Sequence, residues 1–310
     1  MSTSAPLVPV PGERGLASSD RKRLTRRVLA GWDEFVTVAE ATDLDAPSRL
    51  PGWSGRDVLV HLGAWDDARA LDGILASARA GGTGDHIDVD QHNAWVIGRH
   101  RGATRAEVLE SLHAARSTTA DFLASAEADE LGLLPTHSVL GALPVLTTLT
   151  AITYELAVHS VDLGPCGAPA PSSELVQAGL AALMDVTGAL AARHGLEVTV
   201  AAGTPTGGWA FSAYDGDWTT VALDPGADVS GWPSIEGSAL TLLDASAGRV
   251  AVPPLLVRRE LRTHHVPGLL ALAPIVDEVP NLPGGPVLRA AVRYLGGVGK
   301  VMRRIPGFGR

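Results

Sequence analysis

Apolar and polar positions recur with a helical period through the first half of the chain. Between Ser19 and Thr42, apolar residues return every three or four positions, and arginines lie between them. This pattern predicts an amphipathic helix with one buried face. The same period predicts four more helices, from Ser54 to about Arg79, Thr104 to Ala126, about Leu143 to Leu163, and Ser172 to His194.

The stretch from Leu143 to Leu163 differs from the other predicted helices because it is apolar nearly all round. Such a helix suits the centre of a bundle, where neighbouring helices cover every face. Before it, the glycines and polar residues from Gly81 to Asn93 predict a loop or a broken segment. After it, the Gly- and Pro-rich segment from Gly164 to Pro171 is the best candidate for a domain boundary.

Beyond His194 the pattern changes to short alternating runs separated by Gly-Asp turns, which predicts strands. A helical pattern follows between Gly237 and Gly248. We therefore predict an α + (α+β) fold, in which a helical bundle precedes a smaller α+β domain and a basic tail. Their limits are 18–165, 172–285 and 286–310.

Composition narrows the function without deciding it. A length of 310 residues favours two domains, and 45% apolar residues supply enough surface for both cores. The net charge of -9 argues against a nucleic-acid partner, which needs a dense basic face. Small-molecule chemistry is the better expectation.

The chain is also expected to be cytoplasmic. Its one cysteine, Cys166, excludes an intramolecular disulfide framework, and the N-terminus shows no signal pattern. No apolar run reaches the roughly 18 residues that a transmembrane helix needs. The basic residues are nearly all arginine, with Lys22 and Lys300 the only lysines, a bias typical of high-GC, actinobacterial genomes.

One group of side chains has the composition of a metal site. Glu155 and His159 are four residues apart on a predicted helix, so they share one face. His61 lies on another helix of the same bundle, and facing helices build metal sites in this way. Two histidines and one carboxylate leave a coordination position open, as in catalytic zinc sites. The spacing also occurs by chance, and a lone histidine on an apolar helix is often a core residue.

The surroundings of Glu155 favour the metal. Its helix is otherwise apolar, so we expect the carboxylate to be buried, where an unpaired charge costs several kcal/mol. No lysine or arginine lies within a turn of it on that helix. A metal ion is one way to satisfy the charge.

Two segments resemble a known family. The first is Pro51-Gly52-Trp53-Ser54-Gly55-Arg56-Asp57-Val58-Leu59-Val60-His61-Leu62, and the second is Tyr154-Glu155-Leu156-Ala157-Val158-His159-Ser160-Val161-Asp162-Leu163. Together they resemble the mycothiol-dependent maleylpyruvate isomerase family of the DinB/YfiT-like metalloenzymes. The resemblance covers residues 18 to 165 well and continues more loosely to about Arg249. It implies a DinB-like four-helix bundle that binds zinc through His61, Glu155 and His159.

The resemblance also implies a reaction. Mycothiol would bind the open position as a thiolate, because zinc lowers the pKa of its thiol. The thiolate would add to a maleyl double bond, allow rotation and leave, giving the fumaryl isomer of a small electrophilic substrate. Some 60 residues after Arg249 have no counterpart in the resemblance, so other readings stay open. These are a mycothiol S-transferase, a non-haem iron enzyme and a non-catalytic binding module.

Further residues are candidates for supporting roles. Asp162, one turn after His159, could orient the imidazole of that histidine. Arg249 is the candidate for binding a substrate carboxylate, since the family uses an arginine from the second domain and the guanidinium fork suits that group. Its rivals and the residues that could line the mouth of the site are Arg258, Arg259, Arg262, His92 and Asn93.

Two other features do not indicate function. Cys166 has no histidine-bearing motif around it, which argues against a nucleophilic role. The Gly296–Lys300 segment lacks the first glycine of a phosphate loop and the Ser or Thr that follows the lysine.

Overall fold

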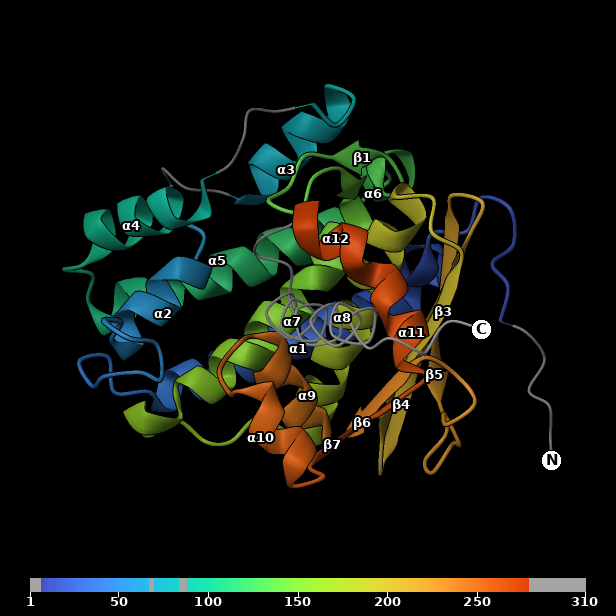
Figure 1. Cartoon of the computed structure of the whole chain (residues 1–310). Helices are drawn as coiled ribbons and strands as arrows, with labels where there is room; N and C mark the ends of the chain where they lie inside the picture. The colour runs from blue at the N-terminus through green and yellow to red at the C-terminus, as the bar shows by residue number, and fades with distance from the viewer. Residues whose placement is uncertain (1–6, 67–69, 84–87, 279–310) are drawn as a thin grey trace, which may run out of the picture. The chain divides into compact units, whose positions relative to one another are not determined.

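The computed structural model describes residues 7–66, 70–83 and 88–278 and divides into two compact units (Figure 1). Of the described residues, 7–12 belong with 187–278, and those between 13 and 186 form the other unit. We call the latter the helical unit and the former the α/β unit. The domain limits predicted from sequence, 18–165 and 172–285, stay a prediction, and the predicted tail at 286–310 lies outside the described residues.

The helical unit contains long helices that agree with the apolar periodicity. The helix α1 packs against α5 and α7, and α2 packs against α4 and α5. The bounds of the main helices and short elements are α1 Arg21–Ala41, α2 Gly55–Leu62, α3 Ala70–Arg79, α4 Val89–His100, α5 Arg105–Ala124, α6 Glu127–Leu131 and α7 Val145–Asp162, with the 3-10 turns η1 Gly15–Ser18 and η2 Gly164–Cys166 and a two-stranded ribbon of β1 Pro135–Thr136 and β2 Leu143–Pro144.

The start of α2 was predicted from sequence and is confirmed. The Ser54 hydroxyl accepts a hydrogen bond from the Asp57 amide, and the Asp57 carboxylate accepts one from the Ser54 amide. This capping box satisfies amides that the first turn leaves open. It fixes the direction in which α2 leaves the Pro51-Gly52 turn, and therefore where His61 lies.

The predicted continuous helix from Ser54 to Arg79 is wrong, because α2 ends at Leu62. A Cβ added to Gly63 would lie 2.2 Å from the Ser111 Oγ, so the chain passes close to α5 here. Trp65 then folds back, and its indole N–H donates to the Val60 carbonyl at 2.9 Å. The break leaves His61 in the last turn of a short helix.

The predicted loop from Gly81 to Asn93 is wrong at its C-terminal end. Residues Val89–His100 form α4, and the Asp88 carboxylate caps it by accepting from the Gln91 amide. The weak amphipathic pattern of this stretch concealed the helix. Its consequence is that Asn93 lies on a helix that packs against α2.

The α/β unit is built around a five-stranded mixed sheet with strand order β5-β4-β3-β6-β7. The strands predicted beyond His194 correspond to β3, β4 and β5, while β6, β7 and the short helices α11 and α12 after β7 were not predicted. Only the β3–β6 pair is parallel. The bounds are β3 Val198–Thr204, β4 Gly207–Tyr214, β5 Asp217–Leu223, β6 Ser234–Gly237, β7 Leu261–His264, α9 Ala239–Ser246, α10 Val252–Val257, α11 Val266–Leu269, η3 Leu270–Leu272 and α12 Ala273–Glu278.

The helix α8, Ser173–Arg193, runs from the helical unit into the α/β unit. It is the one helix in the described part of the chain that is long and apolar enough to span a membrane, which differs from the expectation that no such run exists. However, 89% of its apolar window is buried in the structure. A core helix passes the same test of length and composition, so this is weak evidence for a membrane span.

Gly55 offers a test of how tightly α2 is held. A Cβ at this position would lie 2.4 Å from the Asp43 carbonyl oxygen, which is backbone and cannot move away cheaply. We expect Gly55→Ala to lower the free energy of unfolding by about 1–3 kcal/mol. Gly73 in α3 has nothing within 4 Å of such a Cβ, so Gly73→Ala should raise it by up to about 1 kcal/mol. Urea unfolding of both variants measures this difference, and equal effects would contradict the packing described here.

Candidate metal centre

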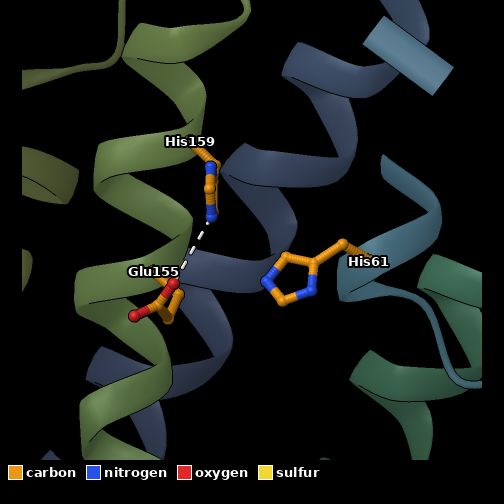
Figure 2. Close-up of side chains that lie close together, drawn as sticks. All are labelled: His61, Glu155 and His159. Carbon is orange, nitrogen blue, oxygen red and sulfur yellow. Dashed lines mark ion pairs between the residues drawn. The ribbon is translucent and has the colours of Figure 1, made fainter. Parts of the chain in front are cut away.

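Three side chains from two helices meet in the helical unit. His61 comes from α2, while Glu155 and His159 lie one turn apart on α7, and their ligand atoms are all within 4.8 Å of one another (Figure 2). Among the described residues, this is the one group of three or more histidine, cysteine or acidic side chains with such geometry. The structure thus brings together the three residues that the sequence suggested.

Glu155 is not buried as predicted. Its side chain is 46% exposed, whereas the His159 side chain is 7% exposed. The argument that a buried, unpaired carboxylate demands a cation therefore fails for Glu155, because water can solvate one side of the carboxylate. The exposure of Glu155 instead leaves one side of the three-residue cluster open to solvent. His159 lies at the buried side of the cluster.

Asp162 is the buried carboxylate of this region. It is fully buried, and its Oδ2 lies 3.0 Å from Nδ1 of His159. The other ring nitrogen of His159, Nε2, lies 3.4 Å from Oε2 of Glu155. A carboxylate on Nδ1 fixes the ring orientation and, in the neutral ring, favours the tautomer whose Nε2 lone pair faces the site.

His61 is positioned by two aromatic rings and an amide. Its ring lies edge-on to those of Trp53 and His159, with centroid separations of 5.6 and 5.4 Å. A side-chain hydrogen bond links it to Asn93 of α4. Sequence reasoning placed Asn93 only at the mouth of the site, because its helix was not recognised.

The two histidines have pKa values shifted in opposite directions. Burial lowers the pKa of His61 to about 4, and the neighbouring His159 adds to the shift. Burial alone would also lower the pKa of His159, but its hydrogen bonds to Asp162 and Glu155 and their negative charges raise it to about 9. The carboxylates therefore favour a cation between them, whether a proton or a metal ion.

These shifts predict the titration of the metal-free protein. Compared with the ordinary histidine pKa of 6.5, the raised pKa of His159 contributes stability that is lost as the pH rises through about 9. The lowered pKa of His61 contributes stability that is lost as the pH falls from 6.5 through about 4. NMR titration of the histidine ring protons after chelation measures both. Two midpoints near 6.5 would contradict this electrostatic description.

The predicted substrate-binding arginine lies in the other unit. Arg249 follows α9, and its Nη1 donates to the Ala247 carbonyl at 3.0 Å. Arg258 pairs with Glu260 at 2.6 Å, and Arg259 has a left-handed backbone conformation at φ 59°. Binding of a substrate carboxylate by Arg249 stays a prediction.

A comparison with known protein families finds a match for the helical part of the chain. Residues 25–164 match the family model described as the mycothiol maleylpyruvate isomerase N-terminal domain. The matched segment is therefore similar to the N-terminal domain of that family. The match confirms the resemblance seen in the sequence, and the domain contains His61, Glu155, His159 and Asp162 but not Arg249.

The likeness to solved structures covers more of the chain than the family match does. A crystal structure of the mycothiol-dependent maleylpyruvate isomerase is 16% identical, covers 76% of this chain and 92% of its own, and has a TM-score of 0.50. At this identity it shows a shared α+β fold. A structure of a mutant of that isomerase covers the same shares at 16% identity with a TM-score of 0.48. No curated protein matches the chain.

Proposed function

We propose that this protein is a metal-dependent enzyme that uses mycothiol to act on a small electrophilic substrate, by cis-trans isomerisation of the maleylpyruvate type. The observation that carries the proposal is the cluster of His61, Glu155 and His159 inside the family's N-terminal domain. The enzyme class and the reaction are both inferred from the family that the helical segment resembles.

The donor set fits a zinc-like ion. An ion bound at about 2.0–2.2 Å from each ligand draws its ligands to within about 4 Å of one another. Ligand atoms within 4.8 Å therefore need only a small inward movement of their side chains. Imidazole and carboxylate together suit zinc, although they also bind iron. When bound, the ion would lower the pKa of a thiol and so provide a thiolate at neutral pH.

The chain's own residues have distinct parts in this proposal. Asp162 holds the Nδ1 side of His159, so that Nε2 faces the site. Asn93 makes a side-chain hydrogen bond to His61 and so helps to hold the His61 ring. Glu155 lies on the open side of the site, where substrates enter. A thiolate held there would add to the substrate double bond, and it would leave after rotation about the resulting single bond.

Several finer features belong to the same proposal. We infer that α1, α2, α5 and α7 form the DinB-like four-helix bundle, since these helices pack on one another. The domains extend over 18–165 and 172–285, and Arg249 binds a carboxylate of the substrate. A cytoplasmic location and an actinobacterial origin are consistent with the use of mycothiol.

The experiment is an assay of maleylpyruvate isomerisation by the full-length protein with and without mycothiol. We expect turnover that requires the thiol and stops after chelation of the metal. Accumulation of a stable thioether product would instead identify an S-transferase. Turnover that does not depend on mycothiol would overturn the proposal, even with the metal site intact.

A further inference from the structure

A cavity of about 580 Å³ lies within the α/β unit, and its volume is in the range of small-molecule sites. Its wall includes the ends of β3 and β6, which form the one parallel pair in the described sheet, and the start of β7 beside them (Figure 1). In open α/β sheets, ligands bind outside the carboxyl ends of parallel strands. No residue of the metal cluster lines this cavity.

The carboxylates of the cavity wall already have partners. They are Asp228, Glu236 and Glu260. Oε2 of Glu236 lies 3.1 Å from Nε2 of His264, and Oε1 of Glu260 lies 2.6 Å from Nε of Arg258. The Asp228 carboxylate accepts a backbone hydrogen bond at 2.9 Å. These contacts offset part of the negative charge that the wall presents to a ligand.

The two guanidinium groups of the wall, those of Arg259 and Arg262, have no such partners. Within the described part of the chain, neither side chain makes a hydrogen bond or ion pair. The register of the sheet places Arg262 opposite Glu236, so the two side chains share a face, but the carboxylate contacts His264 instead. Both arginines are exposed, so an anion can replace the water that solvates them.

Arg259 occupies a backbone position that usually belongs to glycine. It follows the C-terminal cap of α10 and has a φ of 59°. The Arg259 and Glu260 amides donate to the Leu256 and Leu255 carbonyls at 3.1 and 2.9 Å. This is the Schellman pattern of a helix end, in which glycine adopts the left-handed conformation at the lowest cost. The end of α10 therefore does not favour an arginine, whereas a guanidinium group on the cavity wall gives this residue a role.

We propose that this cavity binds a phosphate monoester, through the guanidinium groups of Arg259 and Arg262. Each guanidinium presents parallel N–H groups to two oxygens. Two of them suit the three terminal oxygens and the nearly two negative charges of a phosphate monoester better than a single carboxylate. The uncharged Thr204 and Ser238 also line the cavity, which has room for the alcohol part of the ester. The inference goes beyond the proposed function and requires neither the metal nor a thiol.

Calorimetric titration of the full-length protein with glycerol 3-phosphate at low ionic strength tests the cavity. We expect saturable binding that persists after chelation of the metal. Arg259→Gly and Arg262→Gln should each weaken it about tenfold, since each removes hydrogen bonds between charged groups. Arg26→Gln is the control for the loss of one positive charge, because Arg26 is exposed on α1 in the other unit. This control should bind as the unchanged protein does.

His265→Gly is the matched control for Arg259→Gly. His265 is also exposed and left-handed, with a φ of 46°, but it does not line the cavity. Neither glycine variant should lower the thermal midpoint, because glycine adopts a positive φ without steric cost. Only Arg259→Gly should lose affinity for glycerol 3-phosphate. A loss of affinity at an unchanged or higher midpoint separates a ligand contact from a structural role.

Competition identifies the chemistry of the ligand. Inorganic phosphate should displace glycerol 3-phosphate, and maleate should do so at least about tenfold less well. Displacement by maleate at the same concentration as phosphate would overturn the proposal, because the cavity would then accept carboxylates equally. The absence of saturable binding to the unchanged protein, or equal affinity in all four variants, would overturn it as well.

Discussion

Replacement of His159 by alanine is expected to reduce mycothiol-dependent turnover by about a thousandfold or more. His159 contributes the most buried of the three ligand atoms, and its Nε2 lies 3.4 Å from Glu155. Electrostatic stabilisation by a bound metal ion contributes several kcal/mol to a reaction, and each 1.36 kcal/mol corresponds to about a factor of ten. Steady-state assays with saturating mycothiol measure the loss.

The matched control for this variant is His113→Ala. His113 is an exposed histidine of α5 and is not part of the ligand cluster. We expect its variant to retain full turnover. If His159→Ala keeps more than a tenth of the turnover of the unchanged protein, the assignment of His159 as a ligand is wrong.

The second large effect concerns Asp162. Its fully buried carboxylate lies 3.0 Å from Nδ1 of His159, so Asp162→Asn removes a charge that holds the ring. Loss of such an outer partner typically weakens metal affinity 10–100-fold. We expect a shift of this size in zinc affinity, measured by competition with a chromophoric chelator.

The variant Asp185→Asn is the control for Asp162→Asn. It shows whether the loss of any buried carboxylate lowers zinc affinity, or only the loss of Asp162. Asp185 is also fully buried, and it accepts a hydrogen bond from the Leu16 amide at 2.9 Å. Its variant should lower stability but leave zinc affinity within about twofold, because the Asp185 carboxylate holds the η1 turn through the Leu16 amide. Equal losses of affinity in the two variants would show that Asp162 acts through stability alone.

The sequence predicted the parts of this fold that depend on local chemistry. Ser54 and Asp57 form a capping box whose spacing is visible in the chain, and the apolar period located α1 and α7. The four-residue step from Glu155 to His159 needs only a helix to become a shared face. Together with the segment around His61, these patterns were sufficient to suggest the ligand cluster.

The features that sequence reasoning missed depend on packing between distant segments. The end of α2 follows from the close approach of Gly63 to Ser111, which no local pattern records. The exposure of Glu155 depends on which neighbours cover α7, so an apolar surrounding sequence gave the wrong burial. The position of Asn93 beside His61 likewise depends on α4, whose first residues, up to Asn93, were predicted to be a loop or a broken segment.

The central claim is that His61, Glu155 and His159 bind one divalent ion. The most direct measurement is the zinc content per chain by mass spectrometry of anaerobically purified protein, compared with Glu155→Ala and His159→Ala. We predict about one zinc per chain in the unchanged protein and little in either variant, because removal of one of three ligands leaves too few donors. Metal content that is the same in all three proteins would contradict the account.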